Sequence, residues 1–479
     1  MALPPEFDQP AGSGLRRVDD AIDRGQSRVF RVLWVLVPSG SIARNQNFQA
    51  LLASRFLSDL ALQALLFGVL IASVRSGGDA LEAAIIGVAY LLPGVALGLF
   101  GGAVADWLPK RFALVTAYLL MGVLSFSLPL VLGFELRGMI AVLFAVRVLH
   151  QVSQPSEASA VPLVATNDEL ASANSFLSLA SSAGEVVGKA LLAPFLVRAF
   201  DIEPVVYLAG GLFIFSATRA FRFKVEPGTN GELEELEELD AEEVEPAAPV
   251  RKTSTRQALR WLINEPAAFW MLMLAAMAST TGVVLGVLGP RYVFAVLDVP
   301  PENTFYVFAP ASLGLIVALV LAPILINIFK ERLIAALGFL LVAIGMVALG
   351  MIGTTTDALA DTVLIFDIPG VEEQVEMAAA ISLLLGTGMT LAAAATMTYI
   401  GKYVPSEVHG RMFALLGAMK DGMSIPVLLM MGAVAGFVGV DKVLFVSPLV
   451  LLAIAFGIDA CIGRWRTPEH VEGPVIDRI

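Results

Sequence analysis

The sequence predicts an all-α membrane protein, with twelve transmembrane helices in two pseudo-symmetric halves of six. Three observations lead to this prediction. The chain has 479 residues, of which 57% are hydrophobic and only 15% are charged, whereas a typical soluble domain has about 25% charged residues. Apolar stretches of about 18 residues or more, the length that crosses a bilayer, recur along nearly the whole chain. Features of the first half also return in the second half.

Twelve stretches qualify as membrane spans. In chain order they are Asn47–Val74, Leu81–Ala105, Phe112–Phe134, Met139–Ala160, Ala171–Ala199, Pro204–Phe221, Ala267–Val296, Thr304–Phe329, Leu333–Ile352, Met377–Gly401, Met412–Phe437 and Val443–Ile462.

These spans divide the chain into five parts. Residues 1–46 form a cytoplasmic arm, whose apolar stretch Val29–Val37 is interrupted by Arg31 and is expected to be an amphipathic helix on the membrane surface. Residues 47–222 and 266–463 form two six-helix bundles. Residues 223–265 form a cytoplasmic linker, in which Gly231–Pro246 holds nine acids and no base. Residues 464–479 form a cytoplasmic tail.

The distribution of Lys and Arg predicts the orientation. With both termini in the cytoplasm, 22 of the 31 basic residues lie inside, five lie outside and four lie within spans. Cytoplasmic segments of membrane proteins carry an excess of Lys and Arg. We therefore expect a multi-pass protein of the cell membrane, embedded in the lipid bilayer with both termini in the cytoplasm.

Several classes of function are disfavoured by the composition. The single cysteine, Cys461, excludes an internal disulfide and a thiolate metal cluster, and the three histidines have no recognisable metal-binding spacing. The stretch Gly184–Ala190 lacks the spacing of a phosphate-binding loop. No basic face suggests nucleic acid as a partner. We expect a protein that is not an enzyme, has no cofactor or metal site and acts as a monomer.

Two turns of the first half have counterparts in the second half. Asp106 and Arg111, in the stretch Gly101–Leu114 after the second span, align with Asn327 and Arg332 after the eighth span. A second similarity relates the turns that precede the fifth and the eleventh spans. Internal repeats of this kind are typical of transporters whose substrate site lies between the repeats.

The turn Gly102-Ala-Val-Ala-Asp106-Trp-Leu-Pro109-Lys110-Arg111 resembles the G-x-x-x-D-x-x-G-R-K/R signature of the major facilitator superfamily (MFS), with Pro109 in place of a glycine. Arg147-Val-Leu-His150-Gln151 resembles that family's R-x-x-Q-G element, and Gly410-Arg411-Met412-Phe413 resembles its drug and siderophore exporter branch. The resemblance extends over about Asn47 to Ile462 and implies the MFS fold. The fifth span departs from the exporters' G-P-x-x-G-G element, because it reads Gly184-Glu185-Val-Val-Gly188-Lys189.

Ionisable side chains within spans are candidates for function, because burying a charge in a membrane is costly. Arg55 and Asp59 lie one helical turn apart in the first span, so that they can meet on one helix face. Asp59 is the first candidate for proton coupling, and the alternative is a structural ion pair. Arg147 either takes part in proton transfer or only binds backbone carbonyls. Glu157 is a weaker candidate, because it is expected near the cytoplasmic interface.

Glu185 and Lys189 repeat the spacing of four residues in the fifth span, and Lys420 and Asp421 occupy the corresponding depth of the eleventh span. These residues either bind substrate or protons in a central cavity or form a charge network that locks helices together. Glycines at four-residue spacing are expected where helices pack closely. The pairs are Gly94/Gly98, Gly184/Gly188, Gly282/Gly286 and Gly432/Gly436.

The signature turn is expected to form a cytoplasmic gate from Gly102, Asp106, Lys110 and Arg111. A carboxylate at this position can interact with the positive N-terminus of a neighbouring helix. The alternative, anchoring by positive charge alone, suits Lys110 and Arg111 but does not explain Asp106.

Together these features predict a secondary active transporter that works by alternating access, with a proton-coupled, antiport type of efflux as the favoured activity. The apolar spans favour a small amphipathic or lipophilic solute over a sugar or an anion. A facilitator or flippase for a metabolite or lysolipid is the alternative, and a membrane scaffold or sensor without transport is a third hypothesis.

Overall fold

The computed structural model describes residues 42, 45–97, 110–132, 135–161, 164–165, 170–222, 262–359, 372–404 and 409–463. Within these ranges it has 12 helices long and apolar enough to cross a membrane and no strand. The prediction of an all-helical, twelve-span membrane protein is confirmed. The N-terminal arm, most of the linker and the tail lie outside the described residues, as do Gly102 and Asp106.

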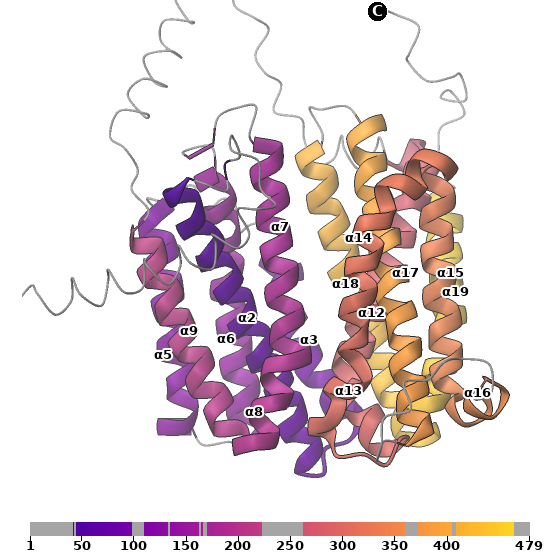
Figure 1. Ribbon diagram of the computed structural model, residues 1–479, viewed down its shortest axis with the longest axis horizontal. Coiled ribbons are helices and arrows are strands. Elements are labelled where there is room, and N and C mark those ends of the chain that lie inside the picture. The colour runs from indigo at the N-terminus through magenta and orange to yellow at the C-terminus, as the bar shows by residue number, and fades with distance from the viewer. Residues whose placement is uncertain are drawn as a thin grey trace, which may run out of the picture.

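The first six spans pack against one another (Figure 1). They are α2 (Gln46–Arg75), α3 (Ala80–Leu97), α5 (Lys110–Ser127) with the π-helical turn η2 (Leu128–Leu132), α6 (Leu136–Ala160), α7 (Leu170–Val186) with its continuation through the π-helical turn η5 (Val187–Leu192) and α8 (Ala193–Phe200), and α9 (Ile202–Arg222).

The last six spans form a second group, drawn from orange to yellow in Figure 1. They are α12 (Pro266–Ala295), the 3₁₀ turn η6 (Pro301–Asn303) leading into α13 (Thr304–Phe308) and α14 (Pro310–Phe329), α15 (Glu331–Gly350), α17 (Glu373–Tyr403), α18 (His409–Val438) and α19 (Val440–Gly463). A short helix that the sequence analysis did not predict, α16 (Ile352–Leu359), follows α15.

Three helices begin at residues suited to a helix N-terminus. The Asn45 side chain caps α2 by accepting hydrogen bonds from the amides of Asn47 (2.9 Å) and Phe48 (3.4 Å). Pro266 and Pro310 stand in the first turns of α12 and α14, where a missing N–H costs nothing. Apolar helices with internally satisfied backbones are the structures that a bilayer tolerates.

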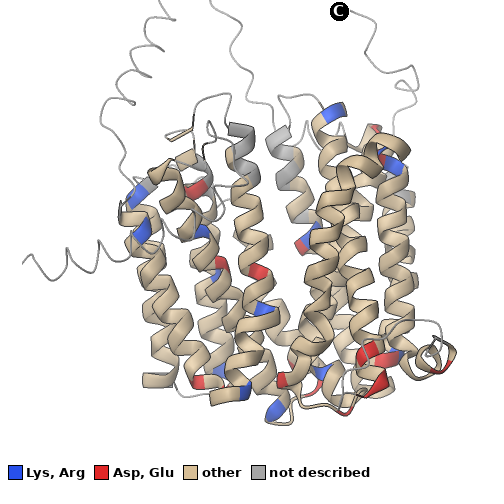
Figure 2. Cartoon of the chain, viewed as in Figure 1, with Lys and Arg blue, Asp and Glu red and all other residues tan. Residues whose placement is uncertain are grey.

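The membrane has two sides, named here after the ends of α2 as the Gln46 side and the Arg75 side. Figure 2 shows that charged residues gather towards the two ends of the helices and are few between them. At the Arg75 side two polar contacts join the groups of helices. Arg75 lies 3.7 Å from Glu302, and Arg198 donates a hydrogen bond of 2.7 Å to the hydroxyl of Tyr306.

Deeper in the membrane, α3 of the first group packs against α12 and α18 of the second group. Glycines permit the close approach. A Cβ at Gly87 would lie 2.6 Å from Leu428, and one at Gly432 would overlap the Cβ of Ala84. The expectation of close packing is wrong for Gly286 and Gly436, because a Cβ at either would meet nothing within 4 Å.

Candidate functional site

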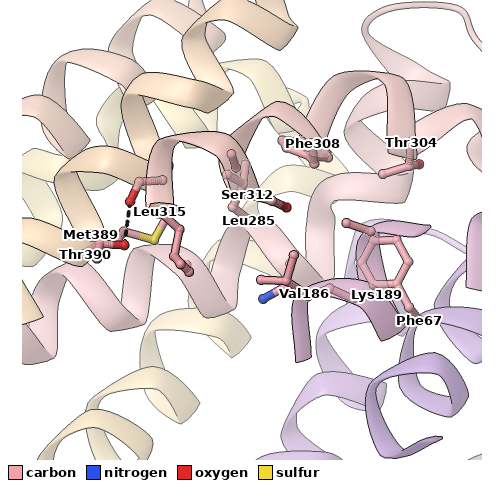
Figure 3. Close-up of a pocket in the computed structure, with 15 residues that line it drawn as sticks. Phe67, Val186, Lys189, Leu285, Thr304, Phe308, Ser312, Leu315, Met389 and Thr390 are labelled. Atoms are coloured by element: carbon pink, nitrogen blue, oxygen red, sulfur yellow. Dashed lines mark hydrogen bonds between the residues drawn. The ribbon is translucent and has the colours of Figure 1, made fainter. Parts of the chain in front are cut away.

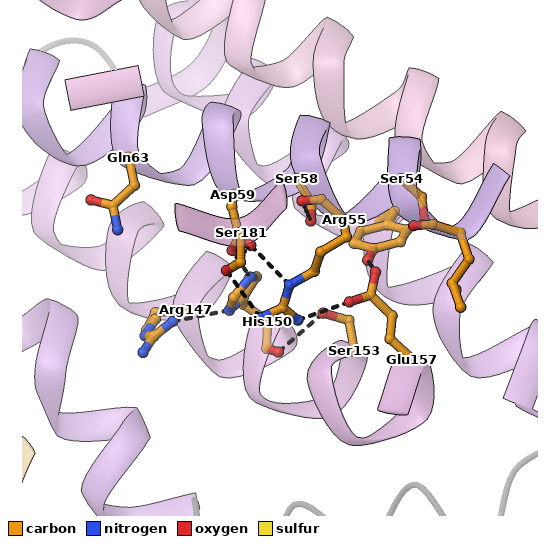
Figure 4. Close-up of polar contacts among 12 residues, drawn as sticks. Ser54, Arg55, Ser58, Asp59, Gln63, Arg147, His150, Ser153, Glu157 and Ser181 are labelled. Atoms are coloured by element: carbon orange, nitrogen blue, oxygen red, sulfur yellow. Dashed lines mark hydrogen bonds and ion pairs between the residues drawn. The ribbon is translucent and has the colours of Figure 1, made fainter. Parts of the chain in front are cut away.

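Arg55 and Asp59 form the buried ion pair that their spacing predicts. The Arg55 Nε lies 2.9 Å from the Asp59 Oδ2, and Asp59 is only 6% exposed. Arg55 and Asp59 lie in the half of the 30-residue helix α2 that begins at Gln46, and Figure 4 shows them with their partners. The position of the pair on the inner face of the bundle, and not towards lipid, is consistent with the cost of exposing charge to hydrocarbon.

Glu157 of α6 is the second carboxylate of this cluster. Its Oε2 lies 2.8 Å from the Arg55 Nη1, and its Oε1 accepts a hydrogen bond from the hydroxyl of Tyr118. Glu157 follows the membrane-crossing stretch of α6, which ends at Gln154, yet it is only 2% exposed and paired inside the bundle. Arg55 therefore bridges two buried acids from two helices.

His150 connects this cluster to Arg147. Its Nε2 lies 3.0 Å from the Asp59 Oδ1, and its Nδ1 lies 2.9 Å from the Arg147 Nη1. An arginine only donates hydrogen bonds, so the Nδ1 of His150 must accept and its Nε2–H must donate to Asp59. The network thus assigns one neutral tautomer of His150. Ser181 of α7 completes the shell of Asp59 by donating a hydrogen bond of 2.5 Å to its Oδ2.

Arg147 faces the boundary between the two groups of helices. Its guanidinium lies 4.7 Å from the ring centroid of Tyr90, and its Nε is buried without a hydrogen-bond partner in the described structure. The alternative that Arg147 only binds backbone carbonyls finds no support in these contacts. The carboxylate of Asp421, on α18 of the other group, lies within the electrostatic reach of Arg147. A Cβ at Gly94 would lie 2.6 Å from that carboxylate, so the absence of a side chain there leaves room for Asp421.

Glu185 and Lys189 also meet as their spacing predicts, at 2.8 Å between Oε1 and Nζ. Lys189 lies in the π-helical turn η5, a type of irregularity that is frequent at functional sites. Gly188 lets this turn approach α2, because a Cβ there would lie 2.5 Å from the Leu60 carbonyl oxygen. After Lys189, Lys420 of α18 is the cation with the largest electrostatic effect on Glu185.

Lys420 acts electrostatically on Asp421, but more weakly than Arg147 does. Adjacent residues of a helix point in different directions, and each of the two also interacts with a further charged group. Lys420 acts on Glu185, whereas Asp421 is near Arg147.

A cavity of about 160 Å³ lies between the groups of helices, beside Lys189 (Figure 3). Its wall comes from α2, the end of α7 with η5, α12, α13, α14 and α17. Eleven of its 15 lining residues are apolar or glycine, and the others are Lys189, Thr304, Ser312 and Thr390. Gly286 lies in this wall, which explains why a Cβ there would meet nothing.

Of the predicted gate, the structure describes one side chain. The guanidinium of Arg111 lies 4.4 Å from the ring centroid of Phe221. Gly102, Asp106 and the side chain of Lys110 lie outside the described residues. Among the residues that are described, no group of three His, Cys, Asp or Glu side chains is placed to hold a metal ion.

Two six-helix groups, a cavity between them and paired charges at membrane depth define the class of the molecule as a polytopic transporter fold. The profile of the Major Facilitator Superfamily matches residues 51–425, and the chain belongs to this family. No curated protein matches the sequence.

Solved structures show the same fold at low sequence identity. A point mutant of the nucleoside transporter NupG aligns with a TM-score of 0.64 and 11% identity, covering 87% of this chain and 100% of that chain. A bacterial homolog of the human lysosomal transporter Spinster, in an inward-facing and unoccupied conformation, aligns with a TM-score of 0.64 and 13% identity. The alignment covers 88% of this chain and 98% of that chain. A D-xylose–proton symporter aligns with a TM-score of 0.63 and 12% identity, and the alignment covers 88% of this chain and 98% of that chain.

Proposed function

We propose that the protein is a proton-coupled secondary transporter that exports a small amphipathic or lipophilic solute by alternating access. The family and the fold support a transporter of small molecules. The largely apolar wall of the cavity supports an apolar solute. One structural neighbour is a D-xylose–proton symporter, which is an example of proton coupling on this fold.

The contact that carries the proposal of proton coupling is the one between His150, Asp59 and Arg147. The Nδ1 of His150 accepts from Arg147 only while the imidazole is neutral. A proton on that nitrogen removes the acceptor and places two donors against each other. Proton uptake by the His150–Asp59 pair therefore breaks the bond that holds Arg147.

The released Arg147 has an alternative partner across the boundary between the groups. Asp421 of α18 already lies in its electric field, and the Nε of Arg147 has no hydrogen bond in the described structure. A stronger contact between Arg147 and Asp421 would draw α6 and α18 together. In this mechanism the proton changes a contact between the two halves, which is what coupling to alternating access requires.

Export is proposed from the resemblance of the Gly410–Phe413 stretch to the exporter branch. The excess of basic residues on the Gln46 side supports that side as cytoplasmic, with both termini inside the cell and the acidic linker between two six-helix domains. We propose the cell membrane as the location and a monomer as the working unit.

The test of coupling is the variant Asp59→Asn, reconstituted in proteoliposomes. We expect it to lose accumulation of solute driven by a pH gradient, while exchange of solute without a gradient continues. The matched control is Ser181→Ala, which removes one donor to Asp59 but no titratable group.

Normal gradient-driven accumulation by Asp59→Asn would leave the coupling role with His150 alone or move it to Glu185 or Asp421. If the unmodified protein moves solute with no dependence on the proton gradient, a facilitator or flippase is the better description.

A further inference from the structure

We infer that the cavity binds an organic anion with a small apolar body, such as an aryl or short branched carboxylate. This inference rests on the proposed function, because it names the chemical class of the solute that such a transporter would carry. It also revises the expectation from the sequence that an anion is disfavoured. The reason for this revision is the position of Lys189 in the wall of the cavity.

Lys189 is the charged residue in the wall of the cavity, whose other polar groups are three hydroxyls. The hydroxyls of Thr304 and Thr390 already donate to backbone carbonyls, those of Pro301 and Gly386. An ammonium group has three donors, and Glu185 takes one of those of Lys189. Donors at the cavity therefore remain on Lys189 and on the hydroxyl of the third such residue, Ser312, and a carboxylate can accept from both.

The charges around this end of the cavity also favour an anion. Glu185 is the acid next to Lys189, and both Lys189 and Lys420 act on it. Lys189 lies 2.8 Å from this carboxylate, and Lys420 also acts on Asp421, so Lys189 is the cation that the cavity wall presents. At the opposite end of the polar network, one cation, Arg55, faces two acids, Asp59 and Glu157. An anion beside Lys189 is attracted by the one charged residue of the wall, whereas a cation there is repelled by it.

The volume limits the apolar part of the ligand. A cavity of about 150 Å³ lined by aliphatic and aromatic side chains holds a molecule the size of benzene, and the cavity here has about 160 Å³. The wall contributes Phe67, Leu285, Phe308, Leu315 and Met389, which pack well against a ring or a branched chain (Figure 3). One ring with a carboxylate directed to Lys189 matches both the volume and the charge.

Three probes of nearly equal shape separate charge from size: benzoate, benzamide and benzamidinium. Their binding to the purified protein in lipid nanodiscs is measured by titration calorimetry. We expect benzoate to bind most tightly and benzamidinium most weakly. Lys189→Met should weaken the binding of benzoate by roughly tenfold or more, because a charge-assisted hydrogen bond is lost. It should leave the affinity for benzamide nearly unchanged. Glu185→Gln removes the carboxylate that competes for Lys189 and should strengthen the binding of benzoate.

A second pair of variants tests whether the probes bind in this cavity. Gly286→Leu places a side chain in the open space of the cavity and should abolish binding of all three probes. Its control is Gly436→Leu, at an exposed glycine of α18 with equal space around it, and it should bind as the unmodified protein does. Equal affinity for the three probes, no binding of any of them, or benzoate preference that survives Lys189→Met would overturn the inference.

Failure of this inference differs from failure of the proposed function. Solute transport in proteoliposomes without a preference for benzoate refutes the anion site alone. Selective benzoate binding by a protein that moves no solute supports the anion site and refutes transport.

Discussion

Arg55 joins two buried carboxylates, and replacing it by Met should destabilise the protein strongly. The side chains of Asp59 and Glu157 are 8% and 2% exposed and lie 2.9 and 2.8 Å from the guanidinium. Removing one partner of a buried ion pair costs about 3–5 kcal/mol, because the remaining charge is uncompensated. Here two acids lose their cation at once, but His150 still donates to Asp59 and Tyr118 to Glu157. We therefore expect Arg55→Met to lower the free energy of unfolding by about 3 kcal/mol, although two acids are affected.

Arg75 provides a matched control in the same helix. It also lies between two acids, 3.1 Å from Asp201 and 3.7 Å from Glu302. The side chains of Arg75 and Asp201 are 39% and 69% exposed, so solvent screens the pair. Exposed ion pairs contribute about 0–1 kcal/mol, and Arg75→Met should lose no more than that.

The assay is equilibrium unfolding of the purified variants in mixed micelles, followed by circular dichroism of the helices. The double variant Arg55→Met/Glu157→Gln should recover part of the loss, since it removes one of the two uncompensated charges. Equal losses for Arg55→Met and Arg75→Met would refute the reasoning, and so would a double variant no more stable than Arg55→Met.

Three further predictions concern the gate, the orientation and the contact between the halves. Asp106→Asn should shift the protein towards an inward-open state, because a carboxylate at a helix N-terminus contributes roughly 0.3–2 kcal/mol. Asn327→Ala should shift it much less, and spin-label distances between the cytoplasmic ends of the halves report both. A cysteine at Asn230 should react with impermeant reagents from the cytoplasmic side only; labelling from outside would reverse the proposed topology. Gly432→Val should weaken the packing of α18 on α3 and lower thermal stability, whereas Gly436→Val, which meets open space, should not.

The twelve spans could be predicted because the bilayer imposes one requirement on every one of them, a long apolar helix. The ion pairs within a helix could also be predicted, because residues four apart share a helix face. Both Arg55–Asp59 and Glu185–Lys189 depend on nothing but that local geometry.

Contacts between helices were the part that the sequence did not reveal. Glu157 and His150 come to Arg55 and Asp59 from α6, and their distance from α2 depends on how the helices cross. One signal was present in the sequence. His150 follows Arg147 by three residues, and Glu157 follows His150 by seven, so the three lie on one face of α6. A face of three ionisable residues in a membrane span indicates a buried partner.

The cavity could not be predicted from the sequence, because its wall comes from helices of both groups and its shape depends on which glycines are packed and which are not. Gly188 and Gly286 look alike in the sequence. The first is pressed against the backbone of α2, while the second borders open space.

In the proposed mechanism, the charges at membrane depth connect the binding of the proton and of the solute although the two bind at different sites. Four cations and four acids occupy this region, and they balance formally; they are Arg55, Arg147, Lys189 and Lys420, and Asp59, Glu157, Glu185 and Asp421. The two charges on α18 interact with the other group of helices, Lys420 with Glu185 and Asp421 with Arg147. When the halves move, these interactions must change, and a buried charge without a partner costs several kcal/mol. A proton on His150 or an anion beside Lys189 alters the same balance from two ends of the network. Each would therefore change the free energy of the other's binding through the position of α18.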